Sequence, residues 1–449
     1  MYQCASNRIG PNFLSGLILI AVTVSGVHAQ EKPAVSLDQN RVAASIQSQS
    51  QTQAPSSKRS ITLSEAVEIF LRQNLQLVAA RYDIETADAE KLTARLRPNP
   101  QLTAGLSDLP VNLSGPLIKE QTYSYGITRT FELGGKRSKR IGFADANSDL
   151  ARGQFQMAVW QLTNDLKRKF YTVVLNQSLL NLARENQATF AEIVKHTAEL
   201  VNAGEISGLD LERVEVEKLK FDTDVANSER DYEVALRDLR FVLGGDYRAM
   251  DIEVAGTIDY DPYQFSYAEL RDKALAERPD LKAAKLGERS ADANIRLQNA
   301  QRIPDLTLGG GIEQVPEGTS SFTFGVGIEL PISNRNQGER TKALIAKKQA
   351  ETQTQLLTNQ VLSDVDKALV AFEMQTRRVN LYRTGVLTKV NDIQDKTQIA
   401  LKAGESSTLE LLDAIRTRRD TLAGFYQTLF DYQMSLLDLE LATATTLHK

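Results

Sequence analysis

The sequence predicts a mostly helical fold in which long helices are interrupted by four short β-strands of the membrane type. Three observations predict this fold. Proline, which breaks helix interiors, is missing between Pro116 and Pro262 and again after Pro331, so both windows can hold very long helices. The chain is a tandem duplication, because residues 65–105 match residues 269–309 at a constant offset. Each half also carries two segments with the alternating pattern of strands.

Composition excludes several classes of protein. The formal net charge of −4 argues against a nucleic-acid-binding protein. One cysteine and three histidines exclude a disulfide scaffold and leave almost no means of building a Cys/His zinc site. No apolar run reaches about 18 residues, so no helix is expected to span a membrane. We find no nucleophile–base motif, phosphate loop or dinucleotide fingerprint, and we expect neither an enzyme nor a bound cofactor.

The N-terminus reads as a secretory signal peptide over residues 1–29. Arg8 supplies the positive region, residues 13–24 form a short apolar core, and Val27-His28-Ala29 is typical of a cleavage site. Residues 30–60 are rich in Gln and Ser and predict a flexible arm. The protein is therefore expected to be exported, and cleavage would remove its only cysteine, Cys4.

The first structural repeat is expected at 61–260 and the second at 261–449. Apolar residues recur at steps of three and four in the proline-free windows, which is typical of narrow helical seams; in the first window these are Val159, Leu162, Leu166, Phe170 and Val173. The first repeat predicts helices at 62–97, about 135–203 and about 207–243. The second predicts helices at about 267–302, 338–403 and 406–446. At about 1.5 Å per residue, the helix over 135–203 would extend roughly 100 Å.

Four segments show period-2 alternation of apolar and polar residues, at about 101–109, 121–132, 305–313 and 321–330. Each has about 9–11 residues, which is the length of a tilted membrane-spanning strand. The polar positions are mostly Gly, Ser and Thr, which favours a wet lumen over a packed core. Arg129 interrupts the apolar row, so we expect it near a membrane interface or in a shifted register.

Four strands cannot close a barrel, and lipid tolerates no open sheet edge. Two copies of the chain would give eight strands, which is too narrow for an open channel, whereas three copies would give twelve. Three copies could thus share one twelve-stranded barrel, and their long helices could wall a tube that continues the barrel away from the membrane. The alternative is a soluble, structural periplasmic coiled-coil protein whose strands form a small cap domain.

The chain from about 60 to 446 resembles the TolC-type outer-membrane efflux family. The resemblance is carried by the duplication, by the opening ITLSEAVEIFLRQN, by RLRPNPQLTAGL and AQRIPDLTLGGG before the first strand of each half, and by NAGEISGLDL and KAGESSTLELLDA. The segments TFELGGKRSKR at 130–140 and LPISNRNQGER at 330–340 resemble the signatures of the cobalt-zinc-cadmium branch.

The resemblance implies a homotrimer in the cell outer membrane that extends into the periplasm, with a 12-stranded outer-membrane barrel and long helices that form a periplasmic α-helical barrel. It also implies a collar built partly from 244–266 and the C-terminal stretch, and a passive duct. A proton-driven inner-membrane pump of the RND type would supply the energy through a periplasmic membrane-fusion adaptor. The expected cargo is divalent heavy-metal cations, and drugs or organic compounds are the alternative cargo.

The resemblance also places adaptor docking at the two hairpin tips. These are Ala203, Gly204 and Glu205 in the first half and Ala403, Gly404 and Glu405 in the second. Each glycine stands where a helix must reverse, a position that favours positive φ. A simple turn glycine would satisfy the same pattern.

An acidic ring is expected just behind the tips. Glu410 and Asp413 lie at i and i+3, hence on one helix face, and resemble the acidic pair that narrows the family's periplasmic entrance. Asp210 holds the matching place in the first half. Three copies would present stacked rings that concentrate cations and repel anions. The alternative is an ordinary solvated acidic face.

A basic cluster follows the second expected strand, where a helix N-terminus disfavours cations. Its members are Lys136, Arg137, Lys139 and Arg140, with Arg335 and Arg340 in the corresponding place of the second half. Phospholipid headgroups at the outer-membrane lipid surface are the expected partners, and a solvated run is the alternative. His196 and His448 have no neighbour at ligand spacing, so no dedicated metal site is expected.

Overall fold

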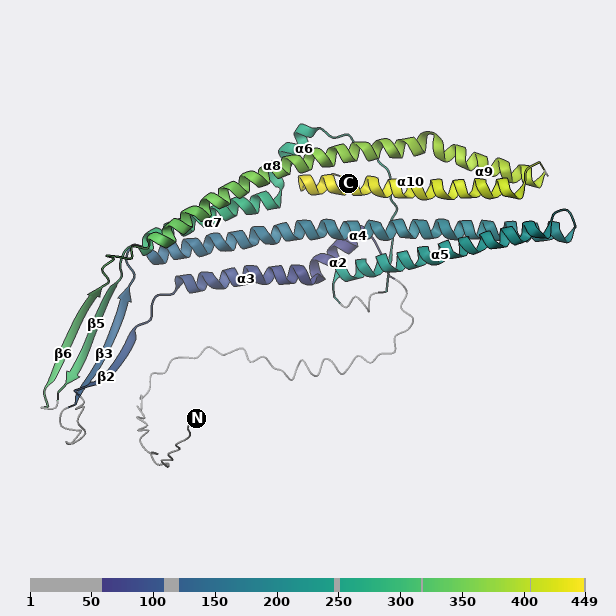
Figure 1. Cartoon of the computed structure of the whole chain (residues 1–449). Helices are drawn as coiled ribbons and strands as arrows, with labels where there is room; N and C mark the ends of the chain where they lie inside the picture. The colour runs from purple at the N-terminus through teal and green to yellow at the C-terminus, as the bar shows by residue number, and fades with distance from the viewer. Residues whose placement is uncertain (1–58, 109–120, 246–250, 316–317, 404, 448–449) are drawn as a thin grey trace, which may run out of the picture. The chain divides into compact units, whose positions relative to one another are not determined.

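A computed structural model of the chain describes residues 59–108, 121–245, 251–315, 318–403 and 405–447 (Figure 1). The expected signal peptide lies outside the described residues, as does the expected arm up to residue 58. The first half contains β1 (Arg59–Ile61), α2 (Leu63–Gln73), α3 (Leu75–Arg95), β2 (Gln101–Ser107), β3 (Thr122–Phe131), α4 (Lys136–Asn202) and α5 (Gly208–Leu243). β4 (Ile252–Val254) ends the first half. The second half contains α6 (Tyr267–Glu277), α7 (Pro279–Gln301), β5 (Leu306–Gln314), β6 (Ser320–Ile328), α8 (Gln337–Leu381), η1 (Tyr382–Val386), α9 (Leu387–Lys402) and α10 (Thr408–Thr443).

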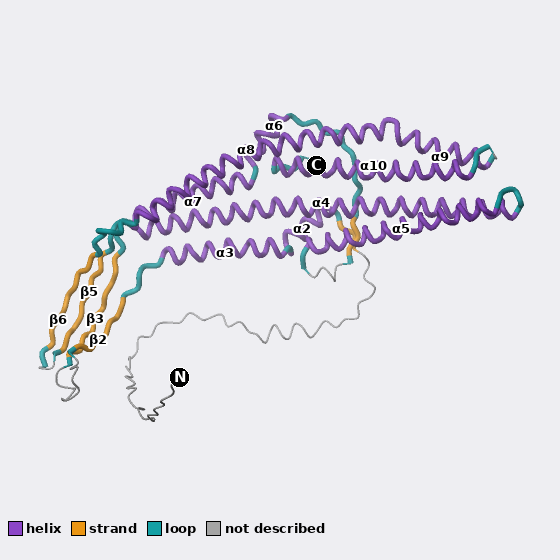
Figure 2. The backbone as a smooth tube through the Cα atoms, in the orientation of Figure 1, coloured by secondary structure: helices purple, strands orange, loops and turns teal. Residues whose placement is uncertain are grey.

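The four long strands form one antiparallel sheet in the order β2-β3-β5-β6. Figure 2 shows these strands side by side, with the helices running away from one end of the sheet. The two halves meet where β3 pairs with β5, for example Tyr125 with Ile312. The register is continuous through Arg129, which pairs with Leu308, and its guanidinium lies 5.3 Å from the centre of the Phe131 ring. Arg129 thus shares the apolar face near the end of β3 that joins the helices.

The helices continue the strand order. Helices α3, α4, α7 and α8 are joined to β2, β3, β5 and β6 respectively, and neighbours in this series pack on one another. Farther from the sheet, α5 packs on α4 to form the first hairpin, and α10 packs on α4, α8 and α9. We call the pair α9–α10 the second hairpin. Helix α4 has 67 residues, so it extends roughly 100 Å.

Two helices that the sequence predicts as continuous are each broken in two. The helix expected at 62–97 ends at Asn74, whose side-chain oxygen accepts from the backbone N–H of Gln76 and of Leu77, both at 3.0 Å, and starts α3. The helix expected at 267–302 breaks between Arg278 and Pro279. The residue before a proline avoids the helical region, and Pro279 then occupies the first turn of α7.

The helix expected at 338–403 is also interrupted, by the single π-helical turn η1 between α8 and α9. Tyr382 of this turn packs against Phe425 of α10, with ring centres 5.8 Å apart. Its hydroxyl lies 2.9 Å from the place that a Cβ on Gly424 would take, so a larger residue there would displace the tyrosine. A π turn inserts one extra residue into the helix, and such insertions occur often at functional positions.

Three apolar cores hold the helices together. The first surrounds Phe70, Phe170 and Leu239, and includes β1 and β4. Arg59 and Ser60 were expected to be the end of a flexible arm. In the structure they belong to β1, which pairs in parallel with β4. The second core surrounds Phe372 and Tyr432 of α8 and α10. The third lies close to the tips of the two hairpins; its buried members are Phe190, Ile193, Val214, Phe221, Leu411, Leu412 and Ile415.

The segment after β4 links the first two cores. Ile258 packs against both of them. The hydroxyl of Tyr432 donates to the backbone oxygen of Asp261 at 2.5 Å, which ties α10 to this segment. Burial raises the pKa of Tyr432, so its hydroxyl remains a donor at physiological pH.

Candidate functional sites at the two ends of the helices

The first hairpin reverses through a Schellman turn. The N–H of Gly204 donates to the oxygen of Val201, and the N–H of Glu205 donates to the oxygen of Leu200, both at 3.0 Å. Gly204 has φ of 74°, which costs an L side chain strain, although the space around it is open. Ala203 and Glu205 are exposed, so this tip is accessible.

The second tip shares one hydrogen bond of this turn. The N–H of Glu405 donates to the oxygen of Ala400 at 2.9 Å, and Ala403 and Glu405 are exposed. Gly404 lies outside the described residues. Ser407 then caps α10 as part of a capping box with Glu410.

The structure gives the three expected acidic residues different environments. One carboxylate oxygen of Glu410 accepts from the Ser406 hydroxyl at 2.6 Å and from the Ser407 N–H at 3.1 Å, and these bonds lower the pKa of Glu410. Asp413 is exposed one turn further along α10. Asp210, in the first turn of α5, faces Arg213 at 3.4 Å. Its charge is thus partly balanced within its own helix.

A buried carboxylate that sequence analysis missed joins the two hairpins. Glu217 of α5 is held by both donors of the Arg416 fork on α10, at 2.6 and 2.9 Å, and by Lys220 at 2.9 Å. Burial by itself would raise the pKa of Glu217, but the bonds from Arg416 and Lys220 outweigh it and hold the pKa below its usual range. The signal for this site was present in the sequence, because Glu217 takes an apolar position between Val214 and Phe221.

Two more arginines of α10 reach the first hairpin. Arg418 contacts Glu185 of α4 at 2.9 Å, and Arg419 contacts Asp224 of α5 at 3.1 Å. The guanidinium of Arg419 also lies over the Phe221 ring, 5.5 Å from its centre. Together with Arg416, these residues place three ion pairs around the third apolar core.

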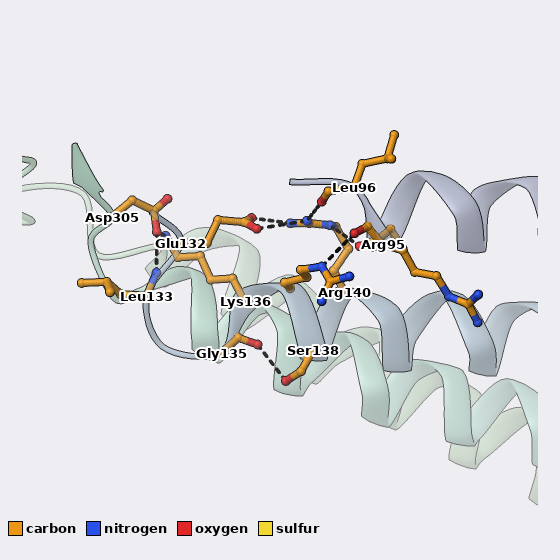
Figure 3. Close-up of polar contacts among 11 residues, drawn as sticks. Arg95, Leu96, Glu132, Leu133, Gly135, Lys136, Ser138, Arg140 and Asp305 are labelled. Atoms are coloured by element: carbon orange, nitrogen blue, oxygen red, sulfur yellow. Dashed lines mark hydrogen bonds and ion pairs between the residues drawn. The ribbon is translucent and has the colours of Figure 1, made fainter. Parts of the chain in front are cut away.

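At the opposite end of the helices, side chains of the basic cluster contact other parts of the same chain (Figure 3). Arg140 pairs with Glu132 at 2.5 Å and donates to the oxygens of Ala94 and Leu96 at 3.2 and 2.9 Å. Arg137 donates to the oxygen of Arg95 at 2.7 Å. These carbonyls end α3, where free C=O groups and the helix dipole favour cations.

The paired members of the basic cluster therefore have compensating partners within the protein, and contact with lipid headgroups stays a prediction. Lys136 contacts Asp305 at 2.7 Å, so it joins the start of α4 to the start of β5. The cations do lie at the N-terminus of α4, where the helix dipole is unfavourable to them. Their contacts with the C-terminus of α3 and with two carboxylates outweigh this unfavourable interaction. Lys139 is exposed, and no described side chain pairs with its ammonium group.

The corresponding second-half residues also contact the protein. Arg340 donates to the side-chain oxygen of Asn299 at 2.7 Å, and Arg335 donates to the oxygen of Pro331 at 3.2 Å. Asn336, which begins α8 with a positive φ, donates to the oxygen of Gln298 at 2.9 Å. Both halves therefore tie the start of the long helix to the end of the preceding shorter helix.

The described residues contain no metal-ion cluster and no membrane-spanning helix. No three His, Cys, Asp or Glu side chains in this part of the chain are grouped so that they could hold a metal ion. His196 lies 4.0 Å from Glu199, and His448 is outside the described residues. No helix in the described ranges combines the length and the apolar character needed to cross a membrane.

Comparison with known proteins shows which protein family has this architecture. The family model for outer membrane efflux proteins matches residues 66–245 and 270–445. The cobalt-zinc-cadmium resistance protein CzcC of Cupriavidus metallidurans is 25% identical over 361 residues, which are 80% of this chain and 84% of that protein. The cation efflux system protein CusC of Escherichia coli K12 is 25% identical over 395 residues, 83% of this chain and 84% of that protein.

The fold agrees with solved structures as well. A crystal structure of CusC superposes with a TM-score of 0.70 at 18% identity, covering 88% of this chain and 95% of that one. The CmeC outer membrane channel of Campylobacter jejuni gives a TM-score of 0.71 at 16% identity, covering 86% and 87%. The family model covers both halves of the duplication, and the chain belongs to the outer membrane efflux protein family, with the TolC-type fold.

Proposed function

We propose that three copies of this chain form a passive outer-membrane duct through which a proton-driven tripartite system of the RND type discharges divalent heavy-metal cations. The observation that carries the proposal is a sheet with two open edges, one apolar face and one polar face. Strands β2 and β6 lie at opposite edges of the four-stranded sheet. A sheet in lipid must pair both edges, and copies of the same chain supply the missing partners.

The two faces of the sheet fit lipid outside and water inside. Leu102 of β2 and Phe324 of β6 are 83% and 87% exposed, and they lie in one cross-strand row that passes through Ile127 and Gly310. Tyr125 and Ile312 pair in a parallel row on the same face. The opposite face carries mostly Gly, Ser and Thr. In a twelve-stranded closed sheet, the first face contacts acyl chains and the second lines the lumen.

The helices carry matching exposed apolar residues on the two flanks of the chain. On the flank of α3 and α5 these are Leu75, Tyr82, Leu92, Val216, Leu219 and Phe241. On the flank of α8 and α9 they are Leu356, Val370, Met374, Leu381, Ile393 and Ile399. Different surfaces that meet head to tail form a ring when the rotation closes. Two copies would supply eight strands, too few for an open channel, so three copies are the smallest ring that fits.

The metal cargo is supported by the relatives and by the acidic tip. Relatives are named for resistance to cobalt, zinc and cadmium, for resistance to nickel and cobalt, and for cation efflux. Glu410 keeps one carboxylate oxygen outside its capping bonds, and Asp413 is exposed beside it on α10. Three copies of each would raise the local concentration of cations at the entrance.

The two exposed tips are the docking points that we assign to the periplasmic adaptor, which in turn connects the duct to the inner-membrane pump. Ala203, Glu205, Ala403 and Glu405 are exposed there. An adaptor that binds these tips would contact one carboxylate from each hairpin. Replacing Glu205 and Glu405 by Lys should abolish adaptor crosslinking, while folding and trimer formation are retained.

Conductance in planar bilayers tests the duct directly. The purified protein should give single channels that prefer cations, and Glu410→Gln with Asp413→Asn should reduce that preference. Glutamine can still cap α10, so the double variant removes charge and keeps the turn. Failure of the unmodified protein both to fractionate with membranes and to conduct would contradict the proposal.

Strain sensitivity tests the cargo. Deleting the gene should sensitise its host to zinc, cobalt and cadmium and leave sensitivity to a panel of drugs unchanged. The reverse pattern would overturn the metal assignment and leave the duct standing.

A further inference from the structure

The four strands of the sheet contain only two charged residues, and these lie on opposite faces. Arg129 of β3 belongs to the apolar row and pairs with Leu308. Glu313 of β5 belongs to the polar row, because it pairs with Ser124 of β3 on one side and with Ser321 of β6 on the other. Residues that pair directly on neighbouring strands point to the same face of the sheet.

The row that contains Glu313 is otherwise uncharged. It runs across the sheet through Gly105, Ser124, Glu313 and Ser321, one residue from each strand. The Glu313 side chain is half-buried, and no hydrogen bond or ion pair joins its carboxylate to any described side chain. A neighbouring position on the same face, Gly311, could not carry a charge, since a Cβ there would lie 2.6 Å from the oxygen of Tyr125.

Glu313 lies far from the acidic residues of the tips. It is the last residue but one of β5, at the end of the sheet away from the helices. It lies seven steps along the strand from Leu306, which is roughly 24 Å, and α4 extends roughly 100 Å in the other direction. Charges separated by more than about 10 Å are largely screened at 0.1 M salt, so Glu313 and the tip acids act independently.

We propose that Glu313 sets the charge preference of the sheet-lined part of the duct, as a ring of three carboxylates that attracts divalent cations and repels anions at its outer end. The inference rests on the proposed function, because the ring exists only when three sheets close. Rings of Asp or Glu favour cations by this electrostatic route without a tight binding site. The duct then has an acidic filter at each end.

The test is the reversal potential of single channels in a KCl gradient at about 0.1 M or below, where screening is weak. Glu313→Gln should lower the ratio of potassium to chloride permeability by about twofold or more. Arg129→Gln is the matched control, since it removes the other strand charge on the lipid side and should leave the ratio unchanged. Trimer formation is checked for every variant by native mass spectrometry.

A double variant separates charge from structure. Glu313→Gln with Ser321→Glu moves the carboxylate to the directly paired residue of the next strand, in the same row and on the same face. Recovery of the permeability ratio supports the ring. An unchanged ratio in Glu313→Gln, or no recovery in the double variant, overturns it while the channel remains. Absence of any channel from the unmodified protein refutes the proposed function and the ring together.

Discussion

The two helical hairpins correspond to one another in the duplicated sequence, yet the structure holds them differently. Helix α4 of the first hairpin is uninterrupted and buries Phe190, Ile193 and Thr197 near its tip. The second hairpin follows a π turn, and Val390 is the one side chain of α9 that is buried among those described. It is joined to the first hairpin by the third apolar core and by ion pairs from Arg416, Arg418 and Arg419.

The difference assigns separate roles to the hairpins. Regions with few buried apolar contacts open at lower free energy than the core. We therefore predict that the first hairpin stays fixed and that the second can separate from it. Four changes test this comparison, from the largest expected effect to the smallest.

Removing an aromatic ring from the third core should have the largest effect. Phe221 is buried and stacks on Phe190, with ring centres 4.6 Å apart. Phe221→Ala should cost about 3–5 kcal/mol of local stability because it leaves a cavity. Hydrogen exchange should accelerate over α9 and the first turns of α10 and stay unchanged at the sheet. Leu409→Ala, at an exposed residue of the second hairpin, is the control and should change exchange little.

Neutralising Glu217 should have the next largest effect. Glu217→Gln leaves the Arg416 fork without its charged partner, and the expected cost is about 1–3 kcal/mol, since Arg416 is partly exposed. A double-mutant cycle with Arg416→Met should reveal a coupling between the two residues. Glu215→Gln, an exposed carboxylate two residues away, should be neutral. Additive effects of Glu217→Gln and Arg416→Met would show that the pair does not hold the hairpins.

Acid should loosen the second hairpin through the same residue. The folded pKa of Glu217 lies below its unfolded value of about 4.3, so its stabilisation is complete above that pH and is lost as the pH falls through the folded pKa. Hydrogen exchange of residues 411–415, corrected for the intrinsic pH effect, should therefore increase below about pH 4. The Glu217→Gln variant should lack this step. A step of the same size in the variant would assign it to another group.

Replacing the glycine of the π turn should have the smallest effect. Gly385 lies inside η1 with open space around its Cβ position and without a positive φ. Gly385→Ala should stabilise the turn by about 0.4–1 kcal/mol, because it restricts the unfolded chain. Exchange over η1 and α9 should slow slightly. Faster exchange would mean that the turn needs the freedom of glycine in its native form.

Pattern and spacing in the sequence were sufficient to place the strands, the long helices and the first tip glycine, Gly204, because alternation and proline placement are local signals. The breaks at Asn74 and Pro279 also had local signals, an Asn before a helical run and a proline within one. No local signal in the sequence indicated the partners of the basic cluster. Arg137 and Arg140 cap α3, a contact between elements that two strands separate along the chain. Pairing of Arg416 with Glu217 likewise depends on how the two halves pack.

Native mass spectrometry of the full chain released from detergent tests the central claim most directly, since every property assigned to the lumen depends on closure of the sheet by copies of the chain. A mass three times that of the mature chain is the predicted result. A single-chain mass under conditions that keep a known trimeric relative intact would contradict the account.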